Sequence, residues 1–234
     1  MKGLLAKAVV KLSALLPDKS VIASKVEWDE LSDENHKYYI VSKKGREIDD
    51  EQFRETGKDN YKELITEDTL LNTTLGDFSD KRVLDIGCGA GRLTEFFSQE
   101  FKKADGVDIS EKMVEKAKKR LEHIENVSFV SNDGQHYPFG ENTFDLVFSY
   151  IVFQHMPSRE IVLENLKDVN RVLKSSGIAK IQIRGGHRVR KGSWYYGPSF
   201  TEDEAKVLAK EAGLTIVKMG DDSVKRFFLW MKKN

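Results

Sequence analysis

From Lys81 onward, short apolar runs alternate with amphipathic stretches. The apolar runs predict five β-strands: RVLDIG, ADGVDIS, VSFV, FDLVFSY and IAKIQIRG. The stretches between them place apolar residues on one helical face, as Leu93, Phe96 and Phe97 do. Strands joined by helices in this way predict a parallel sheet that is covered on both faces.

The C-terminal part adds a helix and a hairpin. Ser110 is placed to cap an earlier helix, and Thr201 opens the last one, whose Glu204 completes a capping box. The runs LTIVKM and VKRFFLWM lie on either side of a turn signal at 220–223. We therefore expect them to pair as an antiparallel hairpin at one end of the sheet, which makes seven strands.

The first 80 residues lack this alternation. Residues 1–17 place leucines and valines near helical spacing and predict an amphipathic helix that ends near Pro17. Residues 18–80 are polar and acidic, and we expect a lid over a pocket or, alternatively, a cap that only stabilises the sheet. The candidate lid contacts are Trp28, Phe53, Arg54 and Tyr61. The predicted domains are 1–80, the N-terminal helix and cap, and 81–234.

Composition excludes several classes of protein. The 234 residues include 38 basic and 38 acidic side chains, so no overall charge favours a nucleic acid. The single cysteine, Cys88, cannot form an internal disulfide, and no uncharged stretch reaches the about 20 residues that cross a bilayer. Residues 1–17 carry lysines without acids, so they contact a membrane surface or, as we favour, pack on their own domain. We expect a cytoplasmic monomer or homodimer without a nucleic-acid partner.

The loop after the first strand is rich in glycine. It reads DIGCGAG from Asp85 to Gly91, at the sheet edge where open α/β folds bind ligands. Its glycines allow a ligand to lie against the backbone, although tight packing of strand on helix also selects glycine. Asp108 ends the second strand, where a carboxylate can accept hydrogen bonds from both hydroxyls of a ribose. Together the two loops predict a nucleoside cofactor.

Two nucleoside cofactors fit this layout. A dinucleotide needs G-x-G-x-x-G to hold its pyrophosphate, but Arg92 stands where the third glycine is required. Asp85 would also repel a pyrophosphate, whereas it suits a ligand that carries an ammonium and a sulfonium group. S-adenosylmethionine carries both.

Four segments resemble, in order, the signatures of class I S-adenosylmethionine-dependent methyltransferases: VLDIGCGAGRLT, GVDISEKM, FVSNDGQHYPF and FDLVFSYIVFQHMP. The resemblance implies a Rossmann-like, doubly wound α/β fold with a mostly parallel seven-stranded sheet and an N-terminal helical cap. It implies S-adenosyl-L-methionine as the cofactor and S-adenosyl-L-homocysteine as its product. It also implies the following cofactor-binding residues: Asp85, Gly87, Cys88, Gly89, Gly91, Asp108, Ile109, Met113, Asn132, Asp133, Gly134 and Tyr150.

Within that set the resemblance assigns parts of the ligand. Asp85 would line the methionine part, Asp108 would hold the ribose, and Asp133 would accept from the adenine amino group. Some members have plainer alternatives. Met113 is also a core residue of its helix, Asp133 an Asx turn, and Cys88 an inert small side chain.

The loop after the fourth strand offers a candidate catalytic group. His155 lies near where the methyl group would project, and an imidazole titrates in the range useful to a general base. Alternatively, His155 caps the helix that begins near Pro157. Tyr150 and Gln154 share this loop and are placed to contact cofactor or substrate.

The segment after the fifth strand, GGHRVRKGSWYYGPSF, combines polar and aromatic side chains. Such a combination suits stacking on a ring or pairing with an anion. It supplies further candidates for substrate binding: His187, Trp194, Tyr195 and Tyr196. We expect no metal.

We therefore predict an enzyme that methylates an oxygen or nitrogen atom of a small molecule by in-line displacement. One alternative is a protein or RNA methyltransferase, which would need a basic or grooved docking face. The other is an adenosyl-binding module without catalytic activity.

Overall fold

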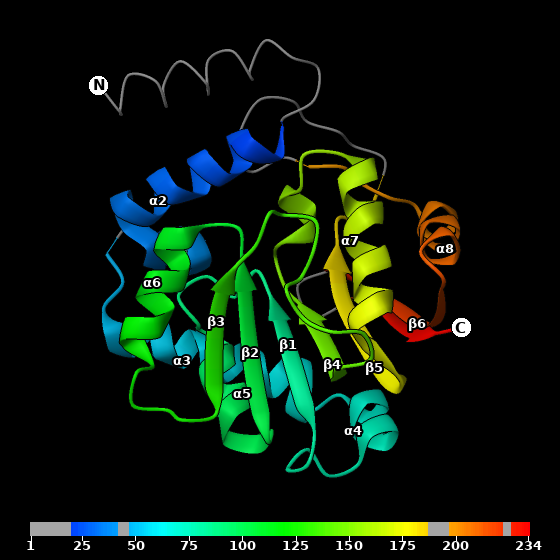
Figure 1. The fold of residues 1–234 in the computed structure, drawn as a ribbon, viewed down its shortest axis with the longest axis horizontal. Coiled ribbons are helices and arrows are strands. Elements are labelled where there is room, and N and C mark those ends of the chain that lie inside the picture. The colour runs from blue at the N-terminus through cyan, green and yellow to red at the C-terminus, as the bar shows by residue number, and fades with distance from the viewer. Residues whose placement is uncertain (1–19, 42–46, 187–196, 222–225) are drawn as a thin grey trace.

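The computed structural model describes residues 20–41, 47–186, 197–221 and 226–234 (Figure 1). Its elements, with a π-helix η1 and a 3-10 helix η2, are α2 (Val21–Val41), α3 (Asp50–Tyr61), η1 (Lys62–Thr66), α4 (Thr69–Leu75), β1 (Arg82–Ile86), α5 (Thr94–Glu100), β2 (Lys103–Asp108), α6 (Glu111–Arg120), β3 (Val127–Ser131), β4 (Phe144–Ser149), η2 (Phe153–His155), α7 (Arg159–Val172), β5 (Leu173–Ile183), α8 (Glu202–Glu211), β6 (Leu214–Asp221) and β7 (Phe227–Lys233). The helix expected at 1–17 lies outside the described residues. Among the helices in these ranges, none combines the length and the apolar character needed to cross a membrane.

A seven-stranded sheet organises the molecule, in the order β3-β2-β1-β4-β5-β7-β6. Strands β1 to β5 are parallel, whereas β7 pairs antiparallel with both β5 and β6. Every residue of β4 is buried, as expected of a strand that is covered on both faces. The predicted Rossmann-like sheet with its antiparallel C-terminal hairpin is confirmed.

Helices cover both faces of this sheet (Figure 1). On one face α7 packs on β5 and α8 packs on β6, and Leu166 and Val169 of α7 are fully buried there. On the other face Phe97 of α5 packs in a core shared with η1 and α4. The expected caps are present, because the hydroxyl of Ser110 accepts from the backbone N–H of Met113 and α8 begins with a capping box. These caps fix the helices that follow the ligand-binding loops.

Part of the segment 18–80 belongs to the core of the sheet. Leu71 of α4 is fully buried, and Asp68, which caps α4, is 7% exposed. One oxygen of the Asp68 carboxylate accepts from Nζ of Lys180 and from Nε1 of Trp230, each at 2.7 Å. This part of the segment therefore stabilises the sheet.

Helix α2 has a different position, across the carboxyl ends of the parallel strands (Figure 1). It packs mainly on α6 and is bent at Asn35, whose φ of −170° and ψ of 81° are not helical. Of the expected lid, α2 is the part that reaches the ligand-binding edge.

Candidate functional site

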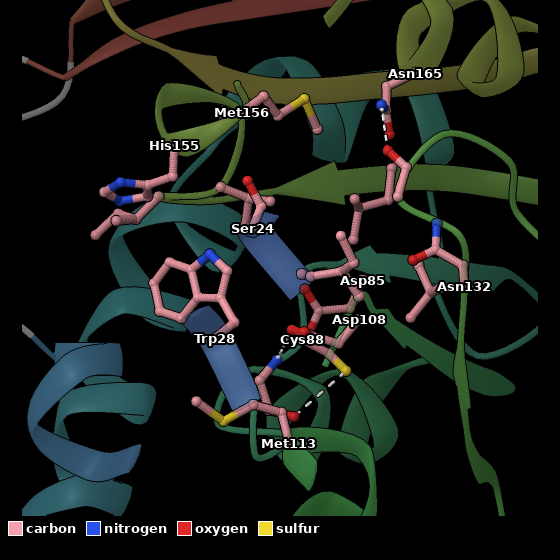
Figure 2. Close-up of a pocket in the computed structure, with 18 of the residues that line it drawn as sticks. Ser24, Trp28, Asp85, Cys88, Asp108, Met113, Asn132, His155, Met156 and Asn165 are labelled. Carbon is pink, nitrogen blue, oxygen red and sulfur yellow. Dashed lines mark hydrogen bonds between the residues drawn. The ribbon is translucent and has the colours of Figure 1, made fainter. Parts of the chain in front are cut away.

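A pocket lies between the glycine loop, α2 and the loop after β4 (Figure 2). It contains about 1130 Å³ of empty space, part of it open to solvent. Most of the predicted site residues line it: Asp85, Gly87, Cys88, Gly89, Asp108, Ile109, Met113, Asn132, Gly134, Tyr150 and His155. Gly91, Asp133 and Gln154 are not among the lining residues. The candidates His187, Trp194, Tyr195 and Tyr196 lie outside the described residues.

The glycine loop turns tightly at the end of β1. Gly87 has a φ of +70°, and a Cβ there would lie 2.2 Å from Cγ2 of Val152. A side chain at this position would therefore be strained and would collide with the loop after β4. Gly91 has a packing role instead, because its Cβ would lie 3.0 Å from Leu121 and 3.1 Å from Phe129. For Gly91 the structure shows the tight packing that was the plainer alternative.

Asp108 joins the two ligand-binding loops. Its Oδ2 accepts from the backbone N–H of Gly89 at 2.8 Å, and its Oδ1 accepts from the N–H of Ser110 at 2.9 Å. Burial raises the pKa of this carboxyl to about 6, against the effect of these hydrogen bonds. Asp108 thus presents a carboxyl acceptor to the pocket.

Asp85 is a buried carboxyl, 3% exposed, at the end of β1. Its Oδ2 accepts from the hydroxyl of Thr94 at 2.6 Å, and in the described ranges no salt bridge joins it to a basic side chain. Burial raises its pKa to about 7, and the charge of Asp108 adds to the increase. A cationic ligand would compensate these two carboxyls, which is the charge that S-adenosylmethionine carries.

Arg92 fixes the far side of the glycine loop. Its guanidinium is 6% exposed, and Nη1 donates to the carbonyl of Thr56 at 3.0 Å and to Oδ1 of Asn60 at 2.7 Å. Burial lowers the pKa of Arg92 to about 10. This residue, which excludes a dinucleotide motif, connects the loop to α3.

Asp133 is not among the residues that line the pocket. Its Oδ1 accepts from the backbone N–H groups of Gln135 and His136, and Oδ2 lies 2.8 Å from Nδ1 of His136. These bonds form the Asx turn that was its alternative. Its neighbours Asn132 and Gly134 line the pocket instead.

His155 lies in η2, 7% exposed, in the pocket wall. The indole of Trp28 meets its ring edge-on, with centroids 5.7 Å apart. His155 is not the cap of α7, because Ser158 occupies that position and accepts from the N–H of Ile161. The Gln154 side chain contacts His155 and Gln182 and does not line the cavity.

Sequence reasoning missed most of the contribution of α2. Besides Trp28, four of its residues line the pocket: Val21, Ser24, Tyr39 and Ile40. The apolar residues of α2 do not gather on one face, so no periodic signal marks them. Of the other lid candidates, Phe53 lies beneath Arg120, Arg54 pairs with Glu95, and Tyr61 packs on Phe97. None of these three side chains lines the described pocket.

The buried thiol and the acidic groups suggest no other chemistry. Burial raises the pKa of the Cys88 thiol, so it is held as the neutral form. In the part of the chain that the structure describes, no cluster of His, Cys, Asp or Glu is arranged to hold a metal ion.

Comparison with known proteins adds independent information. Residues 83–177 match a family described as methyltransferase domain. Demethylmenaquinone methyltransferases of several Staphylococcus aureus strains are 35% identical over 100 residues, which are 42% of this chain and 40% of theirs. The match thus spans less than half the length of these curated relatives.

Solved structures with low sequence identity have a similar fold. Magnesium protoporphyrin IX methyltransferase from Synechocystis PCC 6803, with bound S-adenosylhomocysteine, aligns with a TM-score of 0.66 at 16% identity over 90% of this chain and 98% of its own. Haemonchus contortus phosphoethanolamine N-methyltransferase 1, in complex with phosphoethanolamine and S-adenosylhomocysteine, gives 0.66 at 18% identity over 91% and 48%. At these identities the likeness concerns the fold.

Proposed function

Since residues 83–177 are a methyltransferase domain of the class I S-adenosylmethionine-dependent family, we propose that this chain transfers a methyl group from S-adenosylmethionine to a small molecule. The observation that carries this proposal is a pair of carboxyls, the buried Asp85 and the half-buried Asp108, beside a glycine loop in one pocket. When bound, the cofactor supplies an electrophilic methyl group on a positively charged sulfur.

Asp108 is the proposed ribose contact. A carboxylate offers about four acceptor positions. The backbone N–H groups of Gly89, Ser110 and Ile109 use up to three of them, so at least one remains for a hydroxyl. Asp85 and the loop around Gly87 are proposed to hold the cationic methionine part, because a buried carboxyl stabilises a nearby positive charge.

The main catalytic contribution proposed for the protein is alignment. Holding the acceptor atom in line with the methyl group can supply about 7 to 11 kcal/mol. Helix α2 covers the strand ends and, with Trp28 and Ile40, excludes water from the pocket. Met113, 2% exposed, gives the floor of the pocket an apolar surface on which the adenosine can lie.

The proposed acceptor is a small molecule methylated at oxygen or nitrogen. Helix α2 covers part of the site, whose aromatic and apolar walls include Tyr39, Tyr150 and Met156. The similar proteins are named for small acceptors: demethylmenaquinone, magnesium protoporphyrin IX and phosphoethanolamine.

Calorimetric titration with S-adenosylhomocysteine, followed by transfer of tritiated methyl groups to candidate acceptors, tests the proposal. We expect S-adenosylhomocysteine to bind and NAD to give no heat of binding. Label should pass to a low-molecular-weight fraction of a cell extract. Binding without transfer to any fraction would indicate an adenosyl-binding module, and label on protein or RNA would indicate the other class of substrate.

A further inference from the structure

A chain of side-chain amides holds the loop after β4 and ends at the imidazole of His155. Ile151 adopts a φ of +59°, rare for a β-branched residue, and its N–H donates to Oε1 of Gln182 at 2.9 Å. Nε2 of Gln182 donates to the carbonyl of Ile183 at 2.6 Å and to Oε1 of Gln154 at 3.2 Å. Nε2 of Gln154 lies 3.0 Å from Nε2 of His155.

Two backbone groups determine which way the Gln182 amide points. The N–H of Ile151 can only donate, so it faces the amide oxygen, and the carbonyl of Ile183 can only accept, so it faces the amide nitrogen. Gln182 is 1% exposed. The opposite orientation would place donor against donor and acceptor against acceptor in a buried site, where unsatisfied groups are costly. The backbone therefore fixes the orientation of this amide.

The same reasoning extends to the next two side chains. The NH₂ group of Gln182 needs an acceptor, so Oε1 of Gln154 faces it and the NH₂ group of Gln154 faces His155. An amide NH₂ group can only donate. Nε2 of His155 must therefore accept with its lone pair, and the hydrogen of the neutral ring is on Nδ1.

The surroundings hold this arrangement in place. The backbone carbonyl of Gln154 accepts from Nη2 of Arg184 at 3.2 Å. Gly197 packs so closely on the same carbonyl that a Cβ would lie 2.5 Å from its oxygen. On the other side, the indole of Trp28 contacts the ring of His155 edge-on. The imidazole is thus positioned from several elements.

We propose that Gln182 and Gln154 are positioning residues that hold His155 as the Nδ1–H tautomer, so that this ring orients ligands and is not a general base. The lone pair that could take a proton from an acceptor is on Nε2, and Gln154 already binds it. Nδ1 carries the ring hydrogen and has no lone pair for a proton. The catalytic consequence rests on the proposed methyltransferase function, whereas the tautomer does not.

Nitrogen-15 NMR of the full chain at pH 8 tests the tautomer directly, because protonated and unprotonated ring nitrogens have well-separated shifts. The signals of His155 are identified by their loss in His155→Asn. We expect an unprotonated Nε2 in the parent protein. In Gln154→Glu the carboxylate can only accept, so the hydrogen should move to Nε2.

Gln182→Met tests the relay at a distance, because the hydrogen bonds described for the Gln182 side chain go to Ile151, Ile183 and Gln154 and not to the ring. Without the Gln182 amide, Gln154 can turn over, and we expect a mixture of the two tautomers. Gln99→Glu on the exposed surface of α5 is the matched control and should leave the tautomer unchanged. A protonated Nε2 in the parent, or an unchanged tautomer in both Gln154→Glu and Gln182→Met, would overturn the assignment.

The pH profile of methyl transfer tests the catalytic part separately. If His155 is not a base, its replacement removes no ionisation from the pH profile of kcat. The profiles of the parent and of His155→Asn should therefore have the same shape near about pH 6.5. An ionisation that disappears in His155→Asn would refute the orienting role. An Nδ1–H ring in a protein that transfers no methyl group would support the tautomer and reject the proposed function.

Discussion

Asp85 is a buried carboxyl with one hydroxyl partner and a raised pKa. The cost of burial is what raises its pKa to about 7, so near neutral pH both of its forms are populated. A cation in the pocket would stabilise the ionised form. The proposed sulfonium cofactor therefore gives this otherwise unfavourable charge a partner.

Without ligand, we expect the stability of the protein to fall as the pH rises from about 4 to 7. The pKa of Asp85 in the folded chain, about 7, exceeds the unfolded value of about 3.9, so the folded state binds the proton more tightly in this interval. Asp108, with a pKa of about 6, acts in the same direction. Asp85→Asn should remove its share of the decline, up to about 4 kcal/mol at pH 8. Urea unfolding at pH 5 and pH 8 measures the difference.

Asp77→Asn is the control for this experiment. Asp77 is exposed, and hydrogen bonds from Ser79 lower its pKa, so it is ionised at both pH values. Its substitution should have the same effect at pH 5 and pH 8. If Asp85→Asn behaves like this control, the raised pKa of Asp85 is wrong.

Asp108→Ala should weaken binding of S-adenosylhomocysteine by about 1 to 3 kcal/mol, the cost of a lost hydrogen bond to a charged group. Calorimetry measures this affinity. Asp133→Ala is the matched control and should leave the affinity unchanged, because that carboxylate lies in an Asx turn. Full affinity in Asp108→Ala would remove the ribose role, and a loss in Asp133→Ala would restore the adenine role.

Asp108 and Asp133 also show what sequence reasoning can establish about single residues. Each follows a strand of the parallel sheet, so its place at the ligand-binding edge is predictable from the periodicity of the strands. Whether its carboxylate faces the pocket depends on the nearest backbone N–H groups. The backbone N–H groups of Gln135 and His136 bind the Asp133 carboxylate in a local turn. The backbone N–H of Gly89, in the neighbouring loop, binds the Asp108 carboxylate and holds it at the pocket.

Among the helices and strands, predictability follows local pattern. The strands and the capped helices α6 and α8 were predicted because their periodicity and their capping residues lie in adjacent positions. Helix α2 is capped by Ser20, whose hydroxyl accepts from the N–H of Ala23 at 3.2 Å, but it has no apolar face and it bends at Asn35. Its position over the pocket comes from contacts with α6, about 80 residues away in sequence.

Asp29 is the contact of α2 whose loss should release it most. Its Oδ1 accepts from the hydroxyl of Ser110, which caps α6, at 2.5 Å. Loss of such a bond costs about 1 to 2 kcal/mol. In Asp29→Ala we therefore expect amide hydrogen exchange across 21–41 to quicken by about 5- to 30-fold, measured by mass spectrometry.

Glu111→Ala provides a comparison on the same helix pair. Glu111 pairs with Lys25 of α2 at 2.5 Å, but its side chain is 62% exposed. Exposed ion pairs contribute about 0 to 1 kcal/mol, so exchange should quicken less than about 5-fold. Exchange in α2 that is the same in Asp29→Ala and the parent would show that Asp29 does not hold α2 over the pocket.

For the whole molecule, the polar cluster of Asp68, Lys180 and Trp230 is the least predictable feature. It joins α4 to the neighbouring strands β5 and β7, so it connects the N-terminal segment to the place where the parallel and antiparallel parts of the sheet meet. Nζ of Lys180 also lies 4.8 Å from the ring centroid of Trp230. The three residues are distant in sequence, at positions 68, 180 and 230. Only the folded sheet brings them together.

Asp68→Asn should lower the free energy of unfolding by about 3 to 5 kcal/mol, measured in urea. The side chains of Asp68 and Lys180 are 3% and 4% exposed, and removal of one partner leaves the other charge buried without compensation. The single oxygen of an asparagine can still cap α4, but its NH₂ group then faces Nζ of Lys180 and Nε1 of Trp230, so the loss reports these two hydrogen bonds together with the charge. Adding Lys180→Met should restore much of the stability, because an apolar side chain replaces the uncompensated cation.

The control is Lys167→Ala, which removes an exposed ion pair with Glu164. It should change the free energy of unfolding by less than about 0.5 kcal/mol. A loss below about 1 kcal/mol in Asp68→Asn would show that residues 61–75 are not anchored to the sheet by this pair.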